Sequence, residues 1–146
     1  MSMGFTIHND NIDKTIDEVH EDLSIALENV GIVAERYAVE EIENNPRRVD
    51  TGLLRNSITY ALGGSSADKS SYRADNPKQG RPSSGSYSGT MPGKKWESVS
   101  LGSNLEYAAA VHFGSSTLQP PNPFIYKAFN NHMDEYKNII KDELSN

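Results

Sequence analysis

The sequence predicts an α+β fold in which a long N-terminal helix and a C-terminal helix pack on a small antiparallel sheet, with a long mobile hairpin loop. Three observations predict it. Apolar residues recur every three or four positions across residues 12–44, two short alternating runs stand at 58–62 and 96–101, and a stretch poor in apolar residues separates these runs. The length of 146 residues favours a single domain, residues 1–146.

The first helix is predicted from one apolar stripe, flanked by charged residues. Its members are Ile12, Ile16, Val19, Leu23, Leu27, Val30, Ala34 and Tyr37. We expect Asn11 or Asp13 to cap its start and Pro46 to end it. Some 32 residues at about 1.5 Å each give a rod of roughly 48 Å, which is longer than a small domain needs. We therefore expect part of the stripe to face another subunit.

A short helix and a hairpin are predicted next. Asp50 or Thr51 can cap a helical turn that runs through Ser57. Residues 58–62 alternate and end at two glycines, and residues 96–101 alternate again, so the two runs are expected to pair as a hairpin. Residues 5–8, Phe-Thr-Ile-His, can add a short edge strand.

The C-terminal part is predicted to be helical. Ser103 or Asn104 can cap a helix from 105 to 113, and Gly114 suits the left-handed conformation that follows many helices. Asn122 as cap and Pro123 as first residue then predict a last helix that continues to Leu144.

Residues 63–95 form a basic insertion at the tip of the predicted hairpin. They contain six glycines, eight serines and three prolines, which leaves almost nothing apolar to bury and predicts a mobile segment. The whole chain carries a net charge of −6, but this segment carries +4, so the remainder carries −10.

Composition excludes several classes of protein. The chain has no cysteine, which rules out disulfides, thiol catalysis and thiolate metal sites. No apolar run approaches the ~20 residues that span a bilayer, and the first residues lack the pattern of a secretory signal. We therefore expect a protein made in a cytoplasm, without contact with a membrane. The negative net charge argues mildly against a dedicated nucleic-acid binder.

One triplet resembles a catalytic motif. Asp50-Thr51-Gly52 is the triplet of aspartic proteases, in which two carboxylates share a proton. Here the polar residues 45–48 precede it instead of an apolar strand, and no second copy exists, so only a homodimer could supply the pair. A helix cap with a tight backbone at Gly52 is the simpler interpretation.

The four histidines do not show a metal-binding spacing. His20 and His132 stand among acidic residues on polar helix faces, His8 lies near the start, and His112 lies between Val111 and Phe113. We expect His112 to be a partly buried histidine rather than a ligand. The sequence thus predicts no catalytic, cofactor-binding or metal-binding residue, no cofactor, and a protein that is not an enzyme.

Three blocks in a fixed order carry a resemblance to a known family. They are T-G-x-L-x-x-S-I at 51–58, Y-A-x-x-V-x-F-G at 107–114 and P-F-hydrophobic-x-x-A at 123–128. The blocks follow a long amphipathic helix in the sequence, and a variable insertion separates the first block from the other two. In this order they resemble the tail-component family of tailed bacteriophages. These are the neck, tail-completion or head–tail joining proteins of siphophage type. His112 stands where the family often has an acidic residue.

The resemblance implies a structural protein of the virion, made in the host cytoplasm and assembled in the neck. Its partners would be the neighbouring head–tail connector and tail proteins. The subunit would form a homo-oligomeric ring there, be monomeric in isolation, and lie close to DNA in the channel. We expect the mobile tip to order on assembly, and part of the first stripe and the aromatics Phe124 and Tyr126 to be exposed in the monomer. An accessory protein that touches nucleic acid through the basic loop is the alternative, and a dimeric aspartic protease a remote one.

Overall fold

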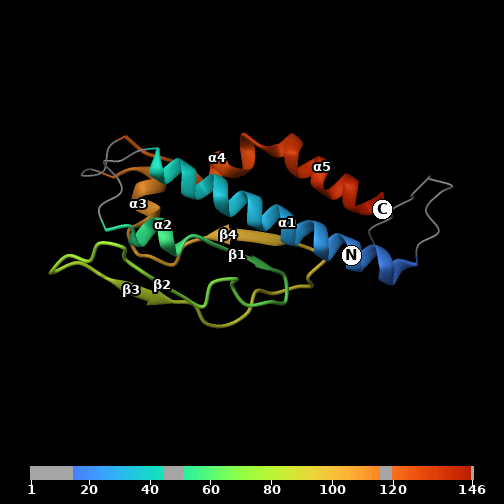
Figure 1. The fold of residues 1–146 in the computed structure, drawn as a ribbon, viewed down its shortest axis with the longest axis horizontal. Helices are drawn as coiled ribbons and strands as arrows, with labels where there is room; N and C mark the ends of the chain where they lie inside the picture. The colour runs from blue at the N-terminus through green and yellow to red at the C-terminus, as the bar shows by residue number, and fades with distance from the viewer. Residues whose placement is uncertain (1–14, 45–50, 116–119, 146) are drawn as a thin grey trace.

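Helix α1 runs along the molecule, with α4 and α5 on one side of it and the strands on the other (Figure 1). The computed structural model describes residues 15–44, 51–115 and 120–145. The elements in order are α1 Ile16–Glu43, α2 Leu53–Ser57, β1 Thr59–Leu62, β2 Ser71–Arg73, β3 Ser84–Ser86, β4 Val99–Gly102, α3 Ala108–Phe113, α4 Phe124–Asn130 and α5 Met133–Leu144. This confirms the predicted α+β class. No helix in the described ranges combines the length and apolar character needed to span a membrane.

Helix α1 begins at a side-chain cap. The hydroxyl of Thr15 accepts a hydrogen bond from the Glu18 amide at 3.2 Å, which satisfies one of the free N–H groups of the first turn. The expected caps Asn11 and Asp13 lie outside the described residues. The stripe is buried in the middle of the helix, at Leu23, Val30 and Ala34, whereas Ile16 at its start is 74% exposed.

Strands β1 and β4 form the predicted antiparallel pair, although 36 residues separate them. Tyr60 pairs with Leu101 and Leu62 pairs with Val99. These four side chains lie on the sheet face that packs on α1, as the contacts of Gly31 with Tyr60 and Val99 show. The predicted edge strand at 5–8 lies outside the described residues.

Gly31 allows α1 to approach this sheet closely. A Cβ atom at this position would lie only 2.5 Å from Cδ2 of Tyr60 and 3.0 Å from Cγ2 of Val99. Any other residue would therefore push the tyrosine ring or the strand away from the helix.

The main core joins the three sequence blocks. Its buried residues are Ala38 and Ile42 of α1, Leu54 and Ile58 of the first block, Ala108 and Val111 of the second, and Phe124 and Ala128 of the third. Phe124 is the largest fully buried side chain. The expectation that Phe124 is exposed is therefore wrong: the blocks fold toward one another, and this ring fills the space between them.

The insertion covers the other face of the β1–β4 sheet. It contains a second antiparallel pair, β2 with β3, in which Tyr72 lies opposite Gly85. The serine- and glycine-rich sequence did not predict these strands. Tyr72 is 6% exposed, and all four residues of β1 are buried. The mobility expected for residues 63–95 in the isolated protein remains a prediction. Movement of this segment would break its contacts with the rest of the protein.

The C-terminal helix differs from the prediction. It is broken into α4 and α5, because His132 has a non-helical backbone and stacks on Tyr37 at a centroid distance of 3.4 Å. Asn122 does not act as a cap either. It is buried, and its side-chain amide donates to the Glu41 carbonyl at 3.2 Å, while Pro123 occupies the cap position.

The α3 helix is also shorter than expected. Its cap position is Tyr107, not Ser103 or Asn104, although the Ser103 hydroxyl accepts from the Leu105 amide at 3.2 Å. Gly114 has the expected positive φ of 83°, but its ψ of 163° is extended rather than left-handed helical.

Candidate interaction surface

The Asp-Thr-Gly triplet begins helix α2. The Thr51 hydroxyl accepts from the Leu53 amide at 3.3 Å, as a capping residue does, although Gly52 takes the formal cap position with φ 82°. A Cβ at Gly52 would lie 2.8 Å from a carboxylate oxygen of Asp75. Asp50 lies outside the described residues. The local geometry at 51 and 52 thus agrees with a helix start, which is the simpler interpretation of the triplet.

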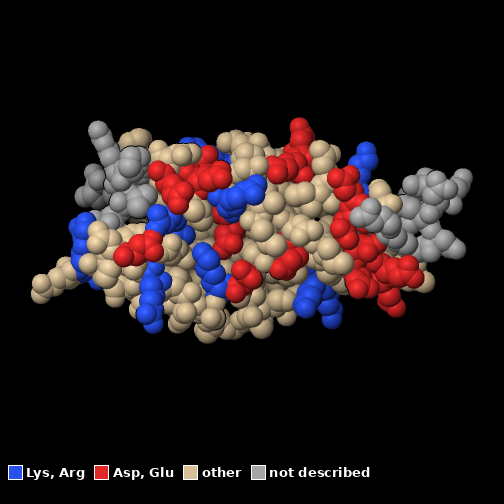
Figure 2. Space-filling view, viewed as in Figure 1, with Lys and Arg blue, Asp and Glu red and all other residues tan. Residues whose placement is uncertain are grey.

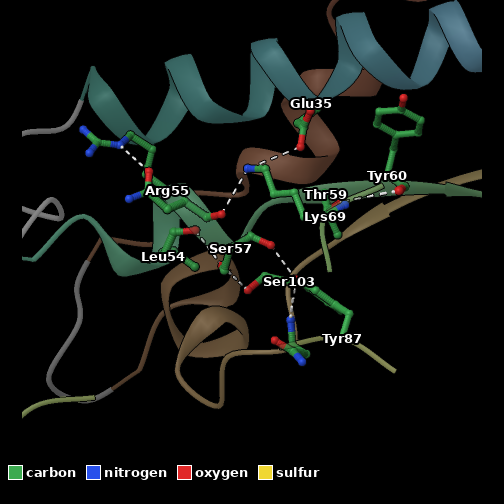
Figure 3. Close-up of polar contacts among 11 residues, drawn as sticks. Glu35, Leu54, Arg55, Ser57, Thr59, Tyr60, Lys69, Tyr87 and Ser103 are labelled. Atoms are coloured by element: carbon green, nitrogen blue, oxygen red, sulfur yellow. Dashed lines mark hydrogen bonds and ion pairs between the residues drawn. The ribbon is translucent and has the colours of Figure 1, made fainter. Parts of the chain in front are cut away.

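Lys69 ties the insertion to the body of the protein. Its ammonium group lies 3.4 Å from the Glu35 carboxylate of α1 and donates to the Asn56 carbonyl at 3.0 Å (Figure 3). The Lys69 amide donates to the Thr59 hydroxyl at 3.0 Å. Burial raises the pKa of Glu35, and the nearby lysine only partly opposes this shift. One residue therefore joins the insertion to α1 and α2 through its side chain and to β1 through its backbone amide.

A second polar joint lies at Arg55 and Asp75. These two residues form an ion pair, and the Asn56 side-chain amide donates to the Arg73 carbonyl at 2.7 Å and to the Asp75 carboxylate at 3.0 Å. Because the Asp75 side chain is 58% exposed, this pair is worth little as a charge interaction, and it mainly fixes position.

Two tyrosines of the insertion form the third joint. The Tyr87 hydroxyl donates to the Ser57 carbonyl and accepts from the Asn104 amide at 3.2 Å (Figure 3). The Tyr72 hydroxyl donates to the Asn104 side chain. The Ser57 and Ser103 hydroxyls hydrogen-bond to each other at 2.6 Å. Both hydroxyls are therefore bonded within the protein, that of Tyr87 to backbone groups and that of Tyr72 to a side chain.

Lys and Arg are dispersed over one face of the molecule. Figure 2 shows Lys and Arg separated by neutral and acidic atoms on this face, while acidic groups gather at the end where α1 begins. Helix α1 alone has nine acidic residues and one basic residue. A nucleic-acid surface needs a continuous basic stripe or patch, which this face lacks.

The described histidines serve the fold. His20 stacks on Trp96 with ring centroids 3.9 Å apart. The Nε2 atom of His112 accepts from the Tyr126 amide at 3.3 Å, and burial lowers the pKa of this histidine, as expected for a partly buried ring. Within the described ranges, no group of three or more potential metal ligands comes together. His8 lies outside them.

Several large apolar side chains are exposed without a role in the core. Phe113 at the end of α3 is 76% exposed and Tyr126 on α4 is 60% exposed. Ile25 and Ile32, seven residues apart on α1, are about half exposed. Phe113 and Tyr126 belong to the second and third blocks, yet they contribute little to the core that the other block residues build.

The sequence prediction missed the polar joints. Glu28 and Glu35 stand seven residues apart beside the apolar stripe, and they accept from the Tyr60 hydroxyl and pair with Lys69. Two acids at this spacing next to a stripe are a usable signal for a second layer.

No protein family, characterised protein or solved structure was found to match this chain.

Proposed function

We propose that this protein is a structural subunit of the head–tail connector, or neck, of a tailed bacteriophage, where it completes the tail or joins it to the head. The ordered set of three blocks carries this proposal. Their buried residues meet in one core around α1, which supports treating them as parts of one fold rather than as three chance matches. Ring closure would make one strong joint from many weak contacts between neighbouring subunits.

The exposed aromatics support a role in assembly. Phe113 is a defining residue of the second block and Tyr126 a variable position within the third, and both leave most of their surface outside the core. An exposed apolar patch is typical of a surface that contacts another protein, and we propose that these two rings form part of one. Neighbouring connector and tail proteins, or further copies of this chain, would cover them in the virion.

Deletion of the gene from the phage that carries it tests the proposal. We expect separate or defective tails, heads that hold or leak DNA, and no infectious particles, because the neck is incomplete. Supplying the intact chain from a plasmid should restore infectivity, which excludes an effect on neighbouring genes. Normal yields of infectious particles from the deletion would refute the proposal.

A further inference from the structure

Helix α5 packs on one element of the protein. Among the described helices and strands, it makes extensive contact only with α1. Its Tyr136 forms one buried cluster with Val30 and Ala34 of α1, and the partly buried Ile139 and Ile140 lie beside them. Figure 1 shows α5 as the last described element, running along the half of α1 that is nearer the N-terminus. Movement of α5 would therefore displace no later helix or strand.

Side chains hold the break between α4 and α5. The His132 amide donates to the Phe129 carbonyl at 3.3 Å, although a regular α-helix would direct it to the carbonyl of Ala128. The Ala128 carbonyl accepts instead from the hydroxyl of Tyr136, and the His132 ring stacks on Tyr37 of α1. Insertion of a side chain into the hydrogen-bond ladder is a recognised cause of a sharp kink. These aromatic contacts therefore account for the break.

The backbone itself favours an unbroken helix. Residues 124–144 contain no glycine or proline, and their apolar spacing continues across the break. The amides of residues 133–135 begin α5, so no carbonyl of α5 lies one turn before them, and His132 provides no side-chain cap. In a continuous helix, the carbonyls of residues 129–131 would accept from these amides. Straightening therefore gains backbone hydrogen bonds and loses the aromatic contacts that hold the break.

A straight helix cannot keep α5 in its present place. A change of the backbone angles at His132 redirects every residue after it, so α5 would leave the α1 helix of its own chain. Val30 and Ala34, which are 4% and 0% exposed, would then lose their cover. A second α5 restores the same buried cluster, and each further copy of the chain carries one. The occupant of this face is thus given by the contacts that the structure already shows.

We propose that copies of this chain exchange α5: α4 and α5 join into one helix, and the α5 of each copy packs on Val30 and Ala34 of a neighbour. Exchange of an identical element is a low-cost way to join protomers, because each contact is one that the monomer already makes. Two copies exchange reciprocally, and transfer from each copy to the next forms a ring where the rotation closes. The inference goes beyond the proposed function and does not need it, because exchange requires only further copies of the chain.

Refolding at high concentration tests the proposal on the unchanged chain. Equal amounts of isotope-labelled and unlabelled chain are unfolded in denaturant, refolded together at the highest soluble concentration and separated by size. We expect an oligomeric fraction in which isotope-filtered NMR spectra show contacts between the methyl groups of Ile139 or Ile140 in one copy and those of Val30 or Ala34 in another. The monomeric fraction should show these contacts only within one chain.

Substitutions at the break test its role as the hinge. His132→Ala removes the stack on Tyr37, and Tyr136→Phe removes the hydroxyl that binds the Ala128 carbonyl, so each should raise the oligomeric fraction several-fold. His20→Ala is the matched control. It also removes a histidine that stacks on an aromatic ring, that of Trp96, but it leaves the break unchanged and should leave the oligomeric fraction unchanged.

Three outcomes would overturn the proposal. A chain that stays monomeric at every concentration, both unchanged and with either substitution at the break, would exclude the exchange. An oligomer in which α1 and α5 of different copies make no contact would show that copies associate through another surface. An equal rise of the oligomeric fraction in His132→Ala and His20→Ala would exclude the break as the hinge.

Discussion

The two faces of the β1–β4 sheet are covered in different ways. The face toward α1 is closed by apolar packing, with Tyr60 against Gly31. The other face is covered by the insertion, which Lys69, Asp75 and Tyr87 hold through ion pairs and hydrogen bonds. Apolar burial stabilises in any orientation, whereas each polar bond depends on one geometry and adds only about 0.5–1.5 kcal/mol. The insertion can therefore be released by changes that leave the core folded.

The largest effect is expected from the core. Phe124→Ala should lower the free energy of unfolding by about 3–5 kcal/mol, because the ring is fully buried between the three blocks. Tyr126→Ala, two residues away and mostly exposed, is the control and should change it by less than ~0.5 kcal/mol. Denaturant titration measures both. Similar losses in the two variants would contradict the described burial.

The insertion should respond to a single lysine. Lys69→Ala leaves Glu35 without its cation and Asn56 without a donor, and should cost about 1–3 kcal/mol. We expect faster hydrogen exchange and faster tryptic cleavage within residues 63–95, with the core still protected. Lys94→Ala, at an exposed position in the same segment, is the control. Loss of exchange protection in the core of the Lys69→Ala variant would show that the insertion is not released independently of the core.

The free energy of unfolding should depend on pH through Glu35, the partner of Lys69. Burial raises the pKa of Glu35 above its usual 4.5, so the folded chain holds this proton to a higher pH than the unfolded chain. The contribution of Glu35 to stability is therefore highest below pH 4.5 and falls as the pH rises through the raised value. Glu35→Gln should flatten this fall in denaturant titrations at a series of pH values. An unchanged slope would assign the pH dependence to other groups.

Among these variants, Phe113→Ala should have the smallest effect on stability and the largest effect on assembly. Phe113→Ala removes a ring that is 76% exposed, so the melting temperature should hardly change. If this ring contacts a neighbour in the neck, plasmid-borne Phe113→Ala should restore fewer infectious particles to the deletion phage. Met133→Ala, exposed but outside the blocks, is the matched control. Full restoration by both variants would remove Phe113 from the proposed contact.

The sequence predicted the elements in which apolar residues recur at a regular spacing. Helix α1 and the β1–β4 pair follow from the spacing of their side chains, even across the insertion. The break at His132 could not be predicted in this way, because the apolar spacing continues from α4 into α5 while the ring of Tyr37, far away in sequence, holds His132 out of the helix. Tertiary contact decided the backbone there.

The second layer of the sheet was missed for a different reason. Composition correctly indicated that residues 63–95 contain little to bury, but two tyrosines are enough when their hydroxyls also find partners. The polar joints depend on pairs such as Glu35 with Lys69, 34 residues apart, which no local pattern specifies. The exposed surfaces of Phe113 and Tyr126 likewise follow from how the blocks pack.

Gly31 also has a consequence for how the chain folds. A glycine inside a helix costs about 1 kcal/mol relative to alanine, and here it lies near the middle of a 28-residue helix. The close approach of Tyr60 that this glycine permits is gained only when β1 is in place. The weakest point of the helix is therefore stabilised by a strand about thirty residues later in the chain. The middle of α1 should acquire its protection together with the strand pair, in one cooperative step, rather than as an early local event.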